Sequence, residues 1–90
     1  MHQFEIEFNY LENSYYASVE VNIIGPLTLT AYNIRPIIDN AQYGVVFTFD
    51  KIAGMYKYPI NTFHFDLYDI IGKSIIKKAA ELEIELPGQI

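Results

Sequence analysis

The chain lacks several residue patterns on which common active sites depend. It contains no cysteine, which excludes disulfide bonds, thiolate metal ligands and a cysteine nucleophile. Its five glycines are isolated from one another, so no Gly-rich loop is available to hold phosphate groups. The sequence also has no Gly-x-Ser-x-Gly motif and no His-x-x-x-His pair. These absences remove the local signatures of phosphate-binding proteins, many hydrolases and zinc enzymes.

Long hydrophobic runs are absent as well. No segment reaches 18 uncharged apolar residues, because the longest candidate, residues 23–38, is broken by two prolines, Gly25 and Arg35. Residues 1–7 have neither the basic start nor the uninterrupted apolar core of a signal peptide. We therefore expect a cytoplasmic protein that neither crosses nor binds a membrane.

Basic residues are scarce. Six Lys and Arg face 11 Asp and Glu, which gives a formal net charge of −5. A negative field repels phosphate backbones, so we expect no nucleic-acid partner, whereas a basic protein would be attracted. Apolar residues make up 51% of the 90 residues, and aromatic residues make up 16%. This content is sufficient for one hydrophobic core and argues against disorder.

A β-hairpin is predicted at the start of the chain. Residues 3–10 and 16–23 each alternate apolar and polar side chains, the pattern of half-buried strands. Glu12, Asn13 and Ser14 are the candidates for the turn between them, and the chain is taken to fold about residues 13–14. Folding the chain about this turn places Glu7 opposite Glu20, a like-charge pair that a two-residue slip would relieve. The pattern predicts the hairpin and its faces, and it leaves the register open.

Three further strands are predicted in the middle of the chain. Residues 27–34 are rich in Thr, Leu and Tyr, residues 45–50 are β-branched and aromatic, and residues 55–60 alternate. Pro59 lies within the last run and predicts an edge strand, because proline cannot donate a hydrogen bond to a neighbour. The polar segment 39–42 indicates a turn, with a short helical turn over residues 36–42 as the alternative.

An amphipathic helix is predicted in the last third of the chain. Asp66 is a suitable N-cap, and Asp69 and Lys73 form an i,i+4 pair in the favourable order. Residues 81–86 alternate, which fits a final strand or a frayed helix end; we favour a helix to about residue 82 and then an extended tail. A period of 3.6 residues aligns one apolar stripe, formed by Leu67, Ile71, Ile75, Ala79 and Leu82.

The order of the predicted strands and helix resembles that of other proteins. Several short strands followed by a helix reading Leu67-x-x-x-Ile71-Gly72-x-x-Ile75-Ile76 resemble small uncharacterised bacterial proteins of about this length. The resemblance extends over the whole chain as an order of elements, and it implies the fold without any activity. We predict a single α+β domain over residues 1–90: a mainly antiparallel sheet of about five strands with one C-terminal amphipathic helix packed on one face.

Two groups of residues deserve a chemical test. His64 precedes the helix near Asp66 and could carry a proton, but no candidate nucleophile lies beside it, and Asp66 is occupied as the cap. Glu5, Glu7 and Glu20 share the outer face of the hairpin and could bind a cation. Their spacing lacks the Gly-turned, Asp-rich loop of a calcium site, so a solvated face is the simpler interpretation. We predict no catalytic residue, no metal site and no cofactor.

The chain has eight tyrosines, more than one small hydrophobic core needs. Tyr16 shares a strand face with polar residues, and if Leu29 points inward, then Tyr32 points outward with Thr28 and Thr30. Exposed aromatic residues on a sheet face are typical contact anchors, because they bury a large area at a small entropy cost. The alternative is a half-buried ring whose hydroxyl remains in water.

These observations favour a small acidic protein-interaction module, such as an accessory subunit or an inhibitor, over an enzyme. Its predicted contact surface is Tyr16, Thr28, Thr30 and Tyr32. The expected partner is another protein, or a second copy of the chain that pairs through an exposed edge strand. A small-ligand carrier that holds an apolar molecule between sheet and helix is the alternative function.

Overall fold

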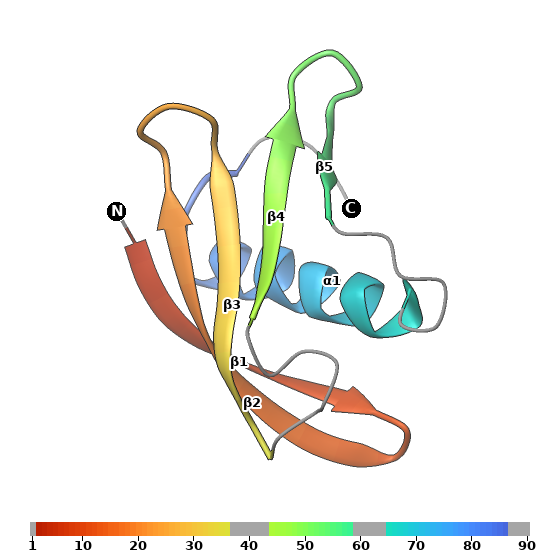
Figure 1. Ribbon diagram of the computed structural model, residues 1–90. Helices are drawn as coiled ribbons and strands as arrows, with labels where there is room; N and C mark the ends of the chain where they lie inside the picture. Colours follow the sequence, from red (N-terminus) through yellow and green to blue (C-terminus); the bar gives the residue numbers. More distant parts are fainter. Residues whose placement is uncertain (1, 37–43, 59–64, 87–90) are drawn as a thin grey trace.

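The protein is an antiparallel sheet with one helix on one face (Figure 1). The computed structural model describes residues 2–36, 44–58 and 65–86. The strand order β1-β2-β3-β4-β5 follows the chain, and all four pairings are antiparallel. The predicted α+β class is confirmed. The elements are β1 (His2–Tyr10), β2 (Asn13–Asn22), β3 (Thr28–Arg35), β4 (Val45–Asp50), β5 (Met55–Lys57) and α1 (Phe65–Glu81).

The core lies between the sheet and α1, which crosses one face of the strands (Figure 1). Four residues of the predicted apolar stripe, Leu67, Ile71, Ile75 and Ala79, are buried as expected. Each strand contributes its inward-facing alternate residues, so the period-two pattern of the sequence corresponds to the two faces of the sheet. The largest fully buried side chains are Phe47, Leu29, Leu67, Ile71, Ile75, Val19 and Val21.

The turn of the first hairpin differs from the prediction. It consists of Leu11 and Glu12, with φ angles of 50° and 66°, and residues 13–14 already belong to β2. Two positive φ angles in a two-residue loop are the mark of a type I′ turn, whose twist matches that of the flanking strands. The register, left open by the sequence, differs by four residues from the one that a turn at 13–14 would give: Glu7 lies opposite Tyr16, and Glu20 lies opposite Gln3. The like-charge pair is avoided, and an even shift leaves every side chain on its predicted face.

A β-bulge interrupts β3 at its end. The pairing with β2 shifts by one residue between Ser18–Tyr32 and Tyr16–Arg35. Asn33 has a φ of 53° in this interval, and both Tyr32 and Asn33 are exposed. An extra residue reverses the inward and outward alternation, which returns Ile34 to the core. The sequence pattern did not predict this bulge.

The second hairpin, β4–β5, is closed by Asp50. Its Oδ1 accepts hydrogen bonds from the N–H groups of Ile52 (2.9 Å) and Ala53 (3.2 Å). Its Oδ2 lies 2.8 Å from Nζ of Lys57. The hydrogen bond from Lys57, with help from the two backbone donors, holds the pKa of Asp50 below its usual value.

Strand β5 ends at Lys57 and forms one edge of the sheet, as predicted. The predicted strand extended to residue 60, but residues 59 and 60, with Pro59 among them, lie outside the described residues. The helical turn considered for 36–42 also lies outside them, except for Pro36, which is in a bend.

Helix α1 begins at Phe65, so Asp66 lies within its first turn and not at the N-cap. Its carboxylate remains near the positive end of the helix dipole. The predicted pair forms: Nζ of Lys73 lies 2.8 Å from Oδ2 of Asp69. Within the described part of the chain, no helix is both long and apolar enough to span a bilayer.

The C-terminal end of α1 resolves the ambiguity of residues 81–86. The N–H of Ile84 donates to the carbonyl of Ala79 (2.8 Å), and the N–H of Glu83 donates to that of Ala80 (3.1 Å). These two bonds form a Schellman motif, which ends the helix at a residue of left-handed conformation, here Glu83 with a φ of 59°. Leu82 was predicted to extend the buried stripe, and this was wrong. It lies beyond the helix and is 47% exposed.

Candidate functional site

The four predicted contact residues lie on the outer face of the sheet, opposite α1. Leu29 and Ala31 are fully buried on the inner face, so Thr28, Thr30 and Tyr32 of β3 point outward. Tyr32 is 37% exposed, and Tyr16 of β2 is 45% exposed. The structure thus brings the four residues to one face of two neighbouring strands; whether they bind a partner stays a prediction.

Cross-strand register arranges this face in rows. Tyr16 lies between Glu7 of β1 and Arg35 of β3. In the adjacent row, Tyr32 lies beside Ser18, whose other neighbour is Glu5. The two tyrosines are therefore diagonal neighbours on adjacent strands, a separation across which aromatic side chains can reach.

An ion pair connects these two rows. Nη2 of Arg35 donates a hydrogen bond to Oε1 of Glu5 at 2.9 Å, across β2. The side chains of Arg35 and Glu5 are 43% and 64% exposed, so solvent weakens this pair, and it contributes less than about 1 kcal/mol to stability. The ion pair mainly changes the local charge. Glu5 neutralises Arg35, and the carboxylate of Glu7 therefore remains as the negative charge beside Tyr16.

The two threonines extend the surface toward β4. Thr30 lies between Glu20 and Val46, and Thr28 lies between Asn22 and Thr48. Val46 is 45% exposed and was missed as a member of this surface. The sequence held no clear signal for it, because residues 45–50 are apolar or aromatic at nearly every position and their alternation is obscured.

The surface carries an excess of negative charge. Glu5, Glu7 and Glu20 lie on it, and Glu7 and Glu20 have no ion-pair partner among the residues that the structure describes. The register separates the carboxylates, with Glu20 opposite Gln3 and Glu7 opposite Tyr16. Within the described ranges, no group of three acidic, His or Cys side chains is placed to hold a metal ion. The surface is therefore suited to cationic side chains more than to a chelated ion.

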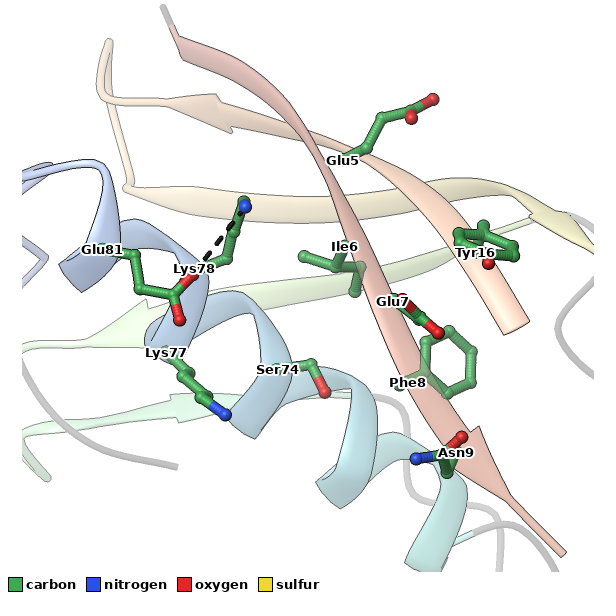
Figure 2. Close-up of a pocket in the computed structure, with 10 residues that line it drawn as sticks. All are labelled: Glu5, Ile6, Glu7, Phe8, Asn9, Tyr16, Ser74, Lys77, Lys78 and Glu81. Carbon is green, nitrogen blue, oxygen red and sulfur yellow. Dashed lines mark ion pairs between the residues drawn. The ribbon is translucent and has the colours of Figure 1, made fainter. Parts of the chain in front are cut away.

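A groove runs along the free edge of β1, next to this surface (Figure 2). It has a volume of about 600 Å³. One wall is residues 5–9 of β1 with Tyr16, and the opposite wall comes from α1. In Figure 2, Ile6 points toward the helix and Glu5 points away from it. The residues from α1 are Ser74, Lys77, Lys78 and Glu81.

A comparison of the chain with protein-family models, curated proteins and solved structures found no match. No relative therefore indicates a function for this chain. Sequence reasoning missed the groove, because it forms only when the last element of the chain packs beside the first. No pattern in the sequence placed Lys77 and Lys78 of α1 opposite β1.

Buried side chains of the sheet and of α1 form the core between these two layers. Whether an apolar molecule binds there, the alternative function, stays a prediction. A second depression, of about 710 Å³, lies outside the core, between the end of α1 and the tail, and is lined in part by Ile76, Ala80 and Ile84. His64, the one residue considered for proton transfer, lies outside the described residues.

Proposed function

We propose that this chain is a protein-interaction module that binds a basic segment of a partner protein on the outer face of its sheet. The observation that carries this proposal is the position of Tyr16, an exposed ring directly beside the unpaired carboxylate of Glu7. A cationic side chain that lies over the ring gains a cation–π interaction and an ion pair at the same site. Tyr32, on the diagonal, provides a second aromatic anchor.

The composition of the surface supports contact with a protein. Tyrosines bury a large area while they lose little side-chain entropy, and their hydroxyls can hydrogen-bond to a partner. Thr28 and Thr30 add hydroxyl groups beside them, and Val46 adds an apolar contact. Negative charge around an aromatic centre selects basic partners and repels acidic ones and phosphates.

An interaction role is also favoured over catalysis by the residues around the tyrosines. The outer-face rows that contain Tyr16, Thr28, Thr30 and Tyr32 offer hydroxyls, amides and carboxylates. In these rows no histidine or cysteine lies beside a hydroxyl to activate it as a nucleophile. An exposed sheet face with hydroxyl, amide and carboxylate groups is suited to binding another protein.

The test is affinity capture with the tagged protein from a lysate of its source, followed by mass spectrometry. We expect a basic protein at stoichiometric yield with the wild type, and its loss with the Tyr16→Ala/Tyr32→Ala variant. The matched control is Leu11→Ala/Ile52→Ala, which removes exposed apolar side chains at two turns away from this surface. A protein captured equally by all three would contradict the proposed surface, and an acidic protein would contradict its charge preference.

A further inference from the structure

The free edge of β1 offers unpaired backbone groups in a regular row. Among the described residues, β1 pairs only with β2. The two-residue loop makes its flanking residues, Tyr10 and Asn13, a hydrogen-bonded pair. Such pairs alternate along an antiparallel ladder, so every second residue of β1 directs its N–H and C=O away from β2. The residues that face the free edge are Gln3, Glu5, Glu7 and Asn9.

The groove beside this edge separates two kinds of surface. The exposed Glu5 and Glu7 alternate along β1 with the buried Ile6 and Phe8, so the two pairs project on opposite faces. Figure 2 shows Ile6 pointing toward α1 and Glu5 pointing away from it. A strand laid against β1 would alternate its side chains between these two environments. Residues directly opposite Glu5 and Glu7 would share their face, where Lys or Arg is favoured. The intervening residues would extend over the buried Ile6 and Phe8 toward Ser74, Lys77, Lys78 and Glu81 of α1. The aliphatic stems of the two lysines offer apolar contact there, while their charged ends disfavour further basic residues.

A second copy of this chain is a poor occupant of the edge. In symmetric antiparallel pairing of β1 with β1 of another copy, the facing residues come from the same set of four. Every register that pairs three or four of them sets a glutamate opposite a glutamate: Glu5 opposite Glu7, Glu5 opposite Glu5, or Glu7 opposite Glu7. Like charges directly opposite one another destabilise strand pairing. Charge complementarity therefore selects a different chain with basic residues at alternate positions.

We propose that the free edge of β1 binds an extended segment of a partner protein as a sixth, antiparallel strand, one that alternates basic residues beside Glu5 and Glu7 with apolar residues toward α1. This inference rests on the proposed function and specifies its binding mode. Backbone hydrogen bonds to the edge give affinity, and the alternating side chains give specificity. The added strand would place a basic residue in the same cross-strand row as Tyr16, on the other side of Glu7, so the edge and the outer face form one continuous site.

The test uses a capped heptapeptide that alternates Val and Lys, titrated into the ¹⁵N-labelled full chain and followed by NMR. We expect the largest amide shifts at Glu5 and Glu7. A peptide N-methylated at its lysines should lose binding, because the residues opposite Glu5 and Glu7 are those whose N–H groups bond to the edge. The matched control, N-methylated at its valines, should bind as well as the parent peptide.

Two variants of the protein test the charge preference. Glu7→Lys should weaken binding of the peptide about tenfold, because it replaces an attraction on the edge with a repulsion. Glu20→Lys makes the same change of net charge on β2, away from the edge, and should weaken binding only about twofold. Glu7→Gln, which removes charge alone, should lie between the two variants.

Three outcomes would overturn the inference. One is the absence of peptide binding to the wild type. Another is binding that shifts Tyr16 and Tyr32 but not the β1 amides and tolerates methylation at lysine, which would leave the proposed outer-face function standing. A third is concentration-dependent shifts at Glu5 and Glu7 without peptide, which would identify a second copy as the occupant. A separate result would contradict the proposed function: capture of the same amount of partner protein by the wild type and by the Tyr16→Ala/Tyr32→Ala variant.

Discussion

The N–H of Ile84 donates a hydrogen bond to the carbonyl of Ala79, five residues back, and this bond turns the chain away from α1. The geometry requires a left-handed residue between them, and that residue is Glu83. Glycine is the usual residue at this position, because it has no Cβ to clash in the left-handed region. A side chain at Glu83 therefore costs about 1 kcal/mol relative to glycine.

We predict that Glu83→Gly raises the free energy of unfolding by about 1 kcal/mol. The control is Glu81→Gly, in the last turn of α1, which should lower stability by about 1 kcal/mol because glycine is unfavourable inside a helix. Urea denaturation of both variants measures the difference. Equal effects of the two substitutions would contradict the assignment of the helix end.

The first turn gives a second prediction. Leu11 and Glu12 both have positive φ, although Asn-Gly is the preferred pair for such a turn. Leu11→Asn/Glu12→Gly should raise the free energy of unfolding by about 1–2 kcal/mol, since it relieves two strained residues. Asn13→Gly, in the first residue of β2, should destabilise the protein, because it introduces backbone freedom into a strand. If Asn13→Gly stabilised the protein instead, the turn would lie at residues 13–14.

Two glycines with positive φ should respond differently to alanine. A Cβ on Gly44 would lie 2.8 Å from the carbonyl oxygen of Ala31, whereas a Cβ on Gly54 would meet nothing within 4 Å. Gly44→Ala should therefore lower the free energy of unfolding by about 3 kcal/mol, from strain and overlap together. Gly54→Ala should lower it by about 1 kcal/mol, from strain alone. Thermal denaturation should give the larger loss for Gly44→Ala, and the reverse order would contradict the predicted overlap.

The buried Tyr56 should make the protein sensitive to alkaline pH. Its hydroxyl has no hydrogen-bond partner among the described residues, and burial raises its pKa to about 12. The unfolded chain releases this proton near pH 10, so the unfolded state binds fewer protons than the folded state between pH 10 and 12. Stability present below pH 10 is lost across that window, by up to about 2 kcal/mol from this group.

The variant Tyr56→Phe isolates this effect. At neutral pH the free energy of unfolding of this variant should be about 1 kcal/mol higher than that of the wild type, because a buried unpaired hydroxyl is removed. Between pH 10 and 12 the advantage over the wild type should widen, which urea titrations at several pH values would measure. A constant difference across this range would show that the pKa of Tyr56 is the same in the folded and the unfolded state.

The sequence predicted the faces of the sheet better than its register. Period-two alternation predicts which side chains point inward, and it places Tyr16, Thr28, Thr30 and Tyr32 on the outer face, where the structure has them. The register depends on the turn, and the residues with turn character, 13–14, lie just after the true turn. Leu11 and Glu12 carry no propensity for positive φ, so local chemistry could not identify them.

The candidate site was predictable only in part for a related reason. The outward tyrosines follow from local alternation, but their neighbours follow from the register. Glu7 beside Tyr16, and Arg35 bound to Glu5 across β2, depend on a turn and on a bulge that the sequence did not reveal. The groove depends on contact between β1 and α1, elements from opposite ends of the chain.

The order of the strands has a kinetic consequence. Each strand pairs only with its neighbours in sequence, so the sheet can assemble through short loops, each with a small entropy of closure. Docking of α1 beside β1 joins the last described element to the first. We therefore expect the sheet to form first, with Ile75→Val in α1 accelerating unfolding while it leaves the folding rate nearly unchanged. In stopped-flow experiments, a slower folding rate for this variant would place helix docking in the transition state.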